Sequence, residues 1–277
     1  MTSSSSLMKG KRGLIMGVAN ERSIAWGIAD MVHKHGAELA FTFQGEALEK
    51  RVRPLADSVG SKIVVPCDVT DMKSIDNTFA AIEKDWGGLD FVVHAIAYSD
   101  KNELDGMYLN TTRENFLKTM DISVYSFTAV AQRAVPLMKN GGSMITMSYH
   151  GAERVMPHYN VMGVAKAALE ASVRYLASDI GKQGIRVNAI SAGPIKTLAA
   201  SCIGDFRYIL KWNELNSPLR RNVTTADVGG AGLFLLSDLG AGVTGEIMYV
   251  DSGYNTTGMV AVDSAKQTAE LLQGISG

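Results

Sequence analysis

The chain has 277 residues, a net charge of −1 at pH 7 and 46% hydrophobic residues, a length that suits one large α/β domain or two small ones. Scattered basic residues give no electrostatic footprint for nucleic acid, and no apolar run approaches the roughly 18–20 residues of a membrane span. The two cysteines, Cys67 and Cys202, are far apart, and the first residues lack the pattern of a signal peptide. We therefore expect a reduced, cytoplasmic protein without nucleic-acid or membrane partners.

Short runs rich in β-forming residues alternate with segments of helical periodicity along the chain. The expected strands, in chain order, are 13–19, 38–43, 62–66, 89–94, 144–147, 185–190 and 246–250. The expected helices are 24–34, 46–59, 74–86, 112–138, one with Pro157 in its first turn that runs to Gly181, 225–236 capped by Thr225, and one containing Val262 to Leu272. This alternation predicts one doubly wound parallel sheet of about seven strands, a Rossmann fold of the α/β class.

The first strand-to-helix turn carries small residues where a dinucleotide-binding sheet holds the pyrophosphate. It reads Gly17-x5-Ser23-x-Ala25-x-Gly27. Gly17 permits a tight turn, and the helix start at Ser23 and Ile24 offers a hydroxyl and backbone amides. A plain strand-to-helix connection with small residues for packing is an equally good interpretation of this turn.

The next three strands end in residues that suit the rest of a dinucleotide. Gln44 can hydrogen-bond a ribose hydroxyl but brings no positive charge for a 2′-phosphate, which favours NADH over NADPH. The carboxylate of Asp68, beside Val69, can accept from an adenine amino group, although an ordinary turn residue is also consistent. Small residues around Ile96 let a cofactor lie flat, and His94 is interpreted as a buried histidine with satisfied hydrogen bonds.

Tyr159 and Lys166 are seven residues apart, close to two helical turns, so we expect them on one face of a helix. A neighbouring ammonium favours the phenolate and makes the hydroxyl a better donor to a developing oxyanion. From this spacing alone, an ordinary surface helix whose tyrosine and lysine share a face is the simpler explanation.

Taken together, these motifs resemble the short-chain dehydrogenase/reductase superfamily and, within it, the bacterial type I enoyl-acyl carrier protein reductases. The resemblance covers about residues 8–254. It rests on the Gly17 turn, Cys67-Asp68-Val69, Ser148-Tyr149, Tyr159-x6-Lys166, Arg186-Val-Asn-Ala-Ile-Ser-Ala-Gly-Pro-Ile195 and Val250-Asp251-Ser-Gly253. Ordinary members of the superfamily carry Tyr-x3-Lys. A six-residue gap, with a second tyrosine ten residues earlier, is the mark of the enoyl reductases.

The resemblance implies reduction of the 2,3 double bond of an enoyl thioester with NADH, the last step of the fatty acid elongation cycle. The thioester would be on acyl carrier protein or on coenzyme A. Tyr159 would donate to the thioester oxygen, Lys166 would hold the nicotinamide ribose, and Tyr149 would line the acyl pocket or assist as an acid. Ile195 and Thr197 would bind the carboxamide and pyrophosphate. The resemblance also implies a homotetramer.

On the same basis, residues 1–8 are a flexible N-terminal tail, 9–254 the reductase domain and 255–277 a C-terminal extension. Within the domain, residues 198–216 are the expected lid over the acyl chain. The expected substrate-binding residues are Ala97, Tyr98, Tyr149, Met162, Ala199, Ile203 and Phe206. Ala97 stands where the family often has glycine and would narrow the slot. Gly204 and Tyr208 stand where lysine is common, which would weaken carrier-protein docking.

Two other functions are considered. A carbonyl reductase of the same superfamily would act on a 3-ketoacyl group, but the six-residue gap argues against it. A non-catalytic dinucleotide-binding protein would have no need to retain both Tyr159 and Lys166.

Overall fold

The computed structural model describes residues 6–198, 200 and 203–273. The strands are β1 (Arg12–Met16), β2 (Glu38–Phe43), β3 (Ile63–Pro66), β4 (Phe91–His94), β5 (Gly142–Ser148), β6 (Ile185–Ala192) and β7 (Ile247–Val250). They form one sheet in the order β3-β2-β1-β4-β5-β6-β7, and every neighbouring pair is parallel. The order reverses between β1 and β4, the place where such sheets bind nucleotides. The predicted doubly wound sheet is confirmed.

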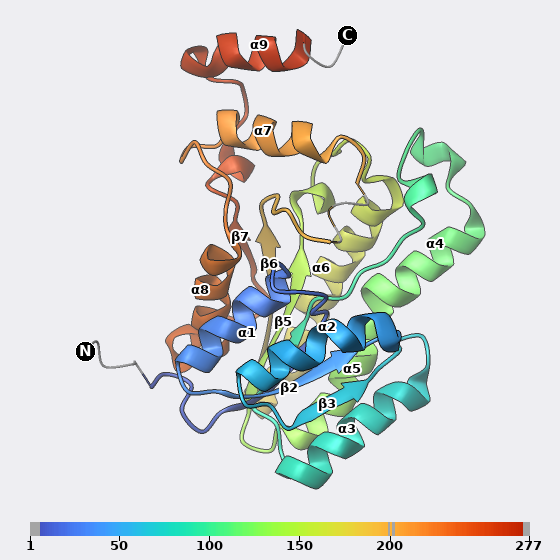
Figure 1. Cartoon of the computed structure of the whole chain (residues 1–277), viewed down its shortest axis with the longest axis vertical. Coiled ribbons are helices and arrows are strands. Elements are labelled where there is room, and N and C mark those ends of the chain that lie inside the picture. The colour runs from blue at the N-terminus through green and yellow to red at the C-terminus, as the bar shows by residue number, and fades with distance from the viewer. Residues whose placement is uncertain (1–5, 199, 201–202, 274–277) are drawn as a thin grey trace.

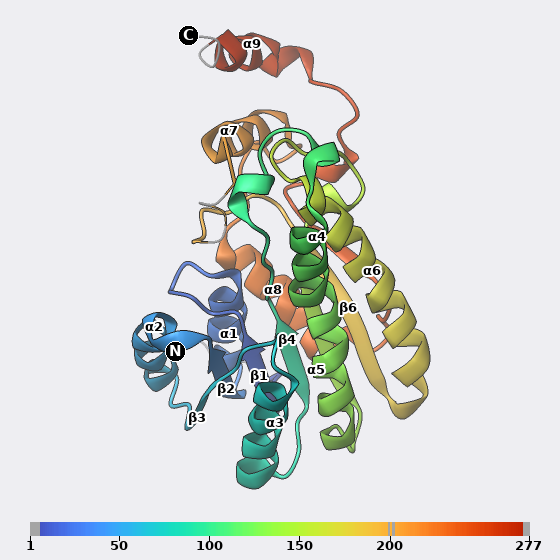
Figure 2. The ribbon, with the colours of Figure 1, turned by 90° about the vertical axis from the view of Figure 1, so that its right-hand side faces the viewer.

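Helices cover both faces of this sheet. They are α1 (Ile24–Lys34), α2 (Gly45–Ser58), α3 (Met72–Trp86), α4 (Arg113–Met120), α5 (Ser126–Ala134), α6 (Asn160–Ile180), α7 (Phe206–Asn216), α8 (Thr225–Leu236) and α9 (Ala265–Gln273). One buried cluster joins the sheet to α1, α2 and α8, and the other joins it to α3, α5 and α6 (Figure 2). Successive residues of β1 alternate between the clusters, because neighbouring side chains in a strand point to opposite faces. This double burial explains why the strands read as continuous apolar runs.

Two helices lie beyond the carboxyl ends of the strands. Figure 1 shows α7 above β6 and β7, with α9 stacked on its outer side. The expected C-terminal helix is therefore present as α9, although Val262 belongs to a preceding 3₁₀ turn and is exposed. Within the described residues, no helix combines the length and apolar character needed to cross a membrane.

The long helix expected over 112–138 is not one regular helix. A π-helical segment, Asp121–Tyr125, separates α4 from α5, and a 3₁₀ turn ends the run. The π segment brings the Ser123 hydroxyl to the backbone that follows β4, where Oγ accepts from the amide of Tyr98 at 3.0 Å and donates to its carbonyl at 3.1 Å. Such insertions often occur at functional sites.

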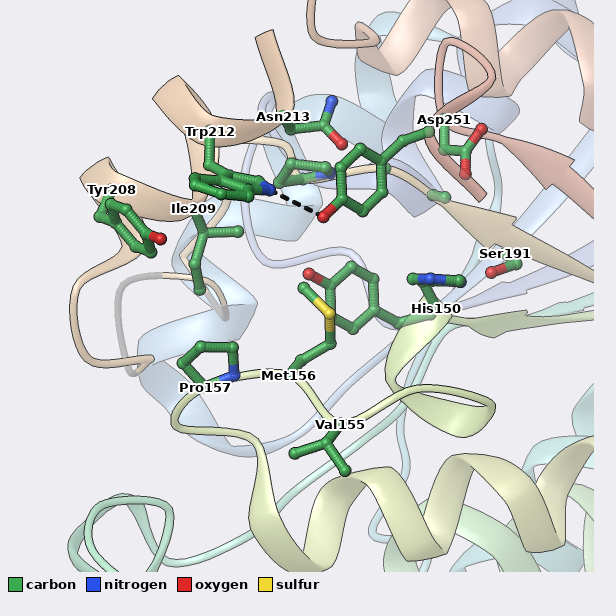
Figure 3. Close-up of a pocket in the computed structure, with 15 residues that line it drawn as sticks. His150, Val155, Met156, Pro157, Ser191, Tyr208, Ile209, Trp212, Asn213 and Asp251 are labelled. Atoms are coloured by element: carbon green, nitrogen blue, oxygen red, sulfur yellow. Dashed lines mark hydrogen bonds between the residues drawn. The ribbon is translucent and has the colours of Figure 1, made fainter. Parts of the chain in front are cut away.

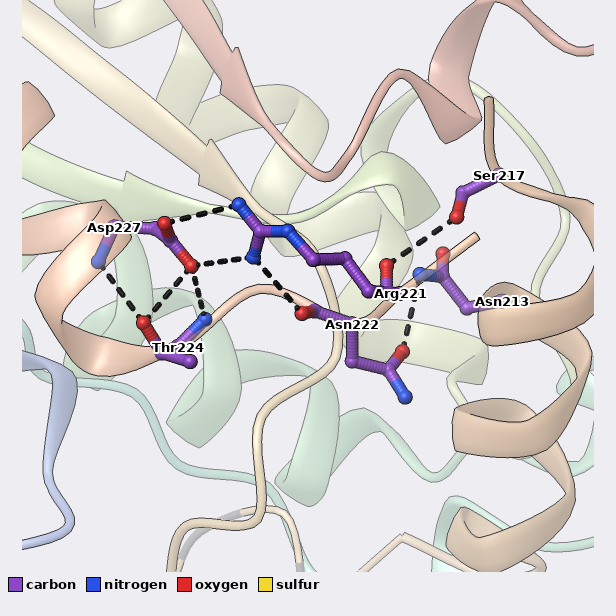
Figure 4. Close-up of polar contacts among 6 residues, drawn as sticks. All are labelled: Asn213, Ser217, Arg221, Asn222, Thr224 and Asp227. Carbon is purple, nitrogen blue, oxygen red and sulfur yellow. Dashed lines mark hydrogen bonds and ion pairs between the residues drawn. The ribbon is translucent and has the colours of Figure 1, made fainter. Parts of the chain in front are cut away.

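Two predicted details at helix starts are wrong, namely the residue that caps α8 and the place of Pro157. Thr224, not Thr225, caps α8: its hydroxyl accepts from the amide of Asp227, and the Asp227 carboxylate accepts from the Thr224 amide. Arg221 holds the same carboxylate through both guanidinium nitrogens, and this network joins the start of α8 to the end of α7 (Figure 4). Pro157 lies in a turn before α6 rather than in its first turn.

Candidate functional site

The segment after β5 delivers the two tyrosines and the lysine of the predicted catalytic set. Tyr149 directly follows the strand, Tyr159 is the residue before α6, and Lys166 lies in the second turn of that helix. Tyr159 is 8% exposed and Lys166 is 6% exposed. The two tyrosine rings meet edge to face, with centroids 5.0 Å apart and planes at 73°. The structure therefore brings all three residues into the same buried corner of the sheet.

A tight turn and a glycine make room for the Tyr159 ring. The backbone around the tyrosine is left-handed at His158 and Asn160, with φ of 56° and 33°. A Cβ on Gly151 would lie 2.5 Å from Cδ1 of the Tyr159 ring, well inside any normal contact. Only glycine therefore fits where the 3₁₀ turn His150–Ala152 packs against this ring.

The electrostatics of this corner differ from the expectation. Burial, and then the neighbouring Tyr149, raise the pKa of the Tyr159 phenol, so it stays protonated and Lys166 does not favour its phenolate. Burial lowers the pKa of Lys166 to about 8, although Glu170 opposes that change. The Lys166 ammonium donates to the carbonyl of Met147 at 2.7 Å, and no hydrogen bond in the described structure joins it to Tyr159. The phenol is thus a hydrogen-bond donor, which is the form that the predicted role requires.

His94 has the structural role that the sequence indicated. It is fully buried, and its ring nitrogens lie 3.0 Å from the Thr146 hydroxyl and 2.8 Å from the Ser126 hydroxyl. Burial, reinforced by the charge of Lys166, lowers the pKa of His94 to about 3. The imidazole therefore stays neutral at working pH.

The β1–α1 turn has the close backbone approach that was predicted for a pyrophosphate site. Gly17 has φ of 99°, and a Cβ there would lie 2.1 Å from the carbonyl oxygen of Ala95. The Ser23 hydroxyl accepts from the amides of Ala19 and Asn20 at 2.9 and 3.1 Å, which fixes the turn just before α1 begins at Ile24. Gly27 instead serves helix packing, because a Cβ there would lie 2.4 Å from the Thr225 carbonyl of α8.

The ends of β2 and β3 bring the predicted ribose and adenine residues together. The Gln44 amide donates to the Asp68 carboxylate at 2.9 Å, and Val69 beside it is buried. The other carboxylate oxygen accepts from the amide and hydroxyl of Thr70, as a turn residue does. Burial opposes the change, but the hydrogen bonds from Thr70 and Gln44 lower the pKa of Asp68. This carboxylate is an acceptor at all working pH values.

The remaining predicted cofactor residues lie where β4 and β6 end. Ile96 is partly buried against the core on the α5 side of the sheet. Ile195 follows β6, and its carbonyl accepts from the amide of Thr197 at 2.8 Å. The Thr197 hydroxyl accepts from the amide of Ala200 at 3.1 Å. These contacts hold Ile195, Thr197 and Ala200 in a fixed arrangement beside the strand ends.

An open cavity of about 220 Å³ lies next to the tyrosines, between α7 and the loop that precedes α6 (Figure 3). Its lining residues are Tyr149, His150, Val155, Met156, Pro157, Ser191, Ala192, Gly193, Pro194, Tyr208, Ile209, Trp212, Asn213, Asp251 and Tyr254. The wall toward Val155, Met156 and Ile209 is apolar. The far end is polar, and Trp212 donates to the Tyr254 hydroxyl there at 2.9 Å. The cavity therefore suits an acyl chain that carries a polar end group.

Of the predicted substrate residues, only Tyr149 lines this cavity. Met162 is buried in the core, Ile203 packs against that core, and Phe206 begins α7 without lining the cavity. Ala199 lies outside the described residues. Ala97 and Tyr98 are exposed after β4, with the Lys118 ammonium 4.8 Å from the Tyr98 ring.

Sequence reasoning missed most of the α7 side of the cavity. Its lining residues are Tyr208, Ile209, Trp212 and Asn213, two pairs at a spacing of four. The apolar face expected for the lid consisted of residues 199, 203, 206 and 209, and among those that the structure describes only Ile209 lines the cavity. For the polar end of the cavity, the signal in the sequence was Asp251 in the Val250-Asp251-Ser-Gly253 motif.

The fold and the site together define an α/β oxidoreductase that binds a dinucleotide at the carboxyl ends of a parallel sheet and carries a buried tyrosine and lysine after the fifth strand.

Comparisons with known proteins identify the family. A family model described as enoyl-(acyl carrier protein) reductase matches residues 17–255. The chain is 67% identical over 264 residues to enoyl-[acyl-carrier-protein] reductase [NADH] 1 of Rhizobium meliloti, covering 95% of this chain and 97% of that protein. The solved enoyl-(acyl-carrier-protein) reductase of Anaplasma phagocytophilum, in complex with NAD, is 61% identical with a TM-score of 0.89, covering 94% and 97% of the two chains. FabI of Candidatus Liberibacter asiaticus is 55% identical with a TM-score of 0.91, covering 93% and 100%. The chain belongs to the enoyl-acyl carrier protein reductase family, which confirms the resemblance found in its sequence.

Proposed function

We propose that this protein reduces the 2,3 double bond of trans-2-enoyl thioesters on acyl carrier protein with NADH, and that Tyr159 and Lys166 are its catalytic residues. The reaction is the last step of the fatty acid elongation cycle. Family membership supports the reaction and the cofactor, since relatives are named for NADH and one is solved with NAD. The residue assignment is carried by one observation: the buried, protonated Tyr159 phenol packs against Tyr149, which lines the wall of the apolar cavity.

The residues at the strand ends fit a bound NADH. The space beside Gly17 that a Cβ would fill, and the amides of Ile24 and Ala25 at the start of α1, suit a pyrophosphate. Gln44 offers a neutral partner for the ribose hydroxyl of the adenosine, and Asp68 offers a carboxylate for its adenine amino group. Neither side chain carries the positive charge that would favour the 2′-phosphate of NADPH. The rest of the NADH site would be lined by Val69, Ile96, Ile195 and Thr197. When bound, the nicotinamide supplies the hydride that is added to the β-carbon of the substrate.

The chain's own side chains then stabilise the charge that this addition creates. As the β-carbon gains a hydride, the electron pair of the double bond moves toward the thioester oxygen, which becomes an enolate. Tyr159 donates a hydrogen bond to that oxygen, and the Lys166 ammonium adds positive charge in a buried site where charge acts strongly. A proton added at the α-carbon completes the saturated thioester. Tyr149 serves as the wall that holds the acyl chain against Tyr159.

The region over the cavity completes the proposal. Residues 198–216, which include α7, act as the lid over the acyl chain. A second open cavity beside α7 is lined by Lys196, Arg207 and Lys211, with Glu214 paired to Lys211, and the two other cations support docking of an acidic carrier protein. We also propose a homotetramer that works in the cytoplasm, as the family resemblance implies.

The test is steady-state turnover, followed by the loss of NADH absorbance. We expect the wild type to reduce a crotonyl thioester but not an acetoacetyl thioester, and to prefer NADH to NADPH. Tyr159→Phe should lower kcat by about 10²–10⁴-fold with NADH binding unchanged. Tyr175→Phe, an exposed tyrosine on the same helix, is the matched control. Turnover of the acetoacetyl thioester alone, or full activity of Tyr159→Phe, would contradict the proposal. Light scattering should give the mass of four chains.

A further inference from the structure

Lys166 shares its buried side of α6 with a second ionisable group, Glu170. The two residues are one helical turn apart and are 6% and 5% exposed. Side chains at this spacing are neighbours on a helix surface. Buried carboxylates are rare unless something holds them. A carboxylate in this place therefore needs a reason beyond packing.

Both side chains are bonded to consecutive residues of β5. The Ser148 hydroxyl donates to the Glu170 carboxylate at 2.5 Å, and the Lys166 ammonium donates to the carbonyl of Met147 at 2.7 Å. Ser148 is the last residue of the strand, and Tyr149 comes directly after it. These two bonds fix α6 in register with the point where the tyrosines begin.

We propose that Glu170 is a positioning residue for the reaction: held by Ser148 at the end of β5, its carboxylate places negative charge beside the buried Lys166 ammonium and keeps that ammonium charged and in place. The proposal rests on the catalytic role proposed above for Lys166. It adds to that role a group that touches neither substrate nor cofactor.

The charges around the pair agree with this assignment. Burial is the main influence on the pKa of Lys166 and lowers it to about 8, while Glu170 acts in the opposite direction. A carboxylate one helical turn away favours the charged form of the lysine, so removal of that charge should lower the pKa of Lys166 further.

Other charged groups face the pair from every neighbouring element. Arg174 on α6 and Glu153 after β5 act on Glu170, with opposite signs. Burial raises the pKa of Tyr249 on β7, and the charges of Glu153 and Glu170 add to that rise. His94 on β4 stays neutral. Burial raises the pKa of the Glu170 carboxyl, and the Ser148 hydrogen bond opposes that rise. Ser148 thus helps the carboxyl remain ionised.

The experiment compares Glu170→Gln with the wild type over a pH series from about 6 to 10, with crotonyl thioester and NADH. Because Lys166 is active only when protonated, kcat falls as pH rises through its pKa. Glu170→Gln should move this alkaline limb to lower pH by about one unit and lower kcat at pH 8 by about fivefold. NADH affinity should change less than about threefold. Glu170→Asp should shift the alkaline limb less than Glu170→Gln does, because aspartate keeps the negative charge.

Asp179→Asn, an exposed carboxylate on the same helix, is the matched control and should leave the profile unchanged. An alkaline limb in Glu170→Gln that coincides with the wild type, or a kcat loss equal at every pH, would overturn the inference. If Glu170→Gln fails to fold, Ser148→Ala should shift the limb in the same direction by a smaller amount, and no shift would overturn the inference. Absence of enoyl turnover in the wild type, or an active Tyr159→Phe, would instead overturn the proposed function.

Discussion

Gly151 offers a direct test of how closely the Tyr159 ring must be placed. Adding one methyl, as Gly151→Ala, would put a Cβ 2.5 Å from Cδ1 and 2.8 Å from Cε1 of that ring. An ordinary carbon contact needs about 3.5–4.0 Å, so the ring or the turn must move by about 1 Å. The ring is only 8% exposed and packs edge to face against Tyr149, so little space is left for it to move.

A displacement of about 1 Å at a catalytic group can cost about 10²-fold in rate, which corresponds to about 2.7 kcal/mol in the barrier. We therefore expect Gly151→Ala to lower kcat for a crotonyl thioester by about 10²-fold, with the KM for NADH nearly unchanged. Overpacking should also lower the free energy of unfolding by about 1–3 kcal/mol. The assay is steady-state NADH oxidation, paired with urea unfolding.

Gly181→Ala is the control, since a Cβ there meets nothing within 4 Å and the residue directly follows α6. It should retain wild-type kcat. If Gly151→Ala keeps kcat within about threefold of the wild type, the required placement of the Tyr159 ring is looser than the contact distances indicate, and the reasoning is refuted.

Two further predictions concern the Arg221–Asp227 contact at the start of α8 and the choice of cofactor. Asp227→Asn loses the Arg221 pair and half of the capping box of α8, and should lower the free energy of unfolding by about 1–2 kcal/mol at pH 7 in urea titrations. The Arg221 hydrogen bond holds the pKa of Asp227 well below its usual value, so this contribution is present above about pH 4 and fades as pH falls further; a difference between variant and wild type that grows in acid would contradict this. Gln44→Arg places a cation where β2 ends, and should improve the KM for NADPH relative to NADH by about tenfold; an unchanged ratio in initial-rate measurements would show that this position does not read the ribose.

The layout of the fold could be predicted because most of its strands are buried on both faces. Successive residues of β1, such as Leu14 and Ile15, enter different cores, so the strand reads as an unbroken apolar run between turns. The β1–α1 turn could also be predicted from the sequence, because the turn needs a positive φ at Gly17 that few other residues adopt. The comparisons confirmed the family that these motifs had indicated.

The details of the site depended on tertiary packing that local patterns do not encode. The π segment at 121–125 exists where Ser123 meets the backbone of Tyr98, a contact between residues 25 apart in sequence. Likewise, the cavity-facing side of α7 depends on where that helix starts, and helix boundaries are weakly marked in sequence. The raised pKa of Tyr159 reflects burial, which spacing to a lysine does not reveal.

The cavity beside the tyrosines is walled by four segments spread over the second half of the chain: 149–157, 191–194, 208–213 and 251–254. During synthesis, a chain that has emerged only through α6 already carries both tyrosines and the lysine, but it has only the first of these walls. The last wall is supplied by residues 251–254, after β7 has joined the sheet. Since domains are completed from the amino end onward, the acyl-binding space comes into being only when nearly the whole chain has emerged, and an unfinished copy cannot sequester a thioester.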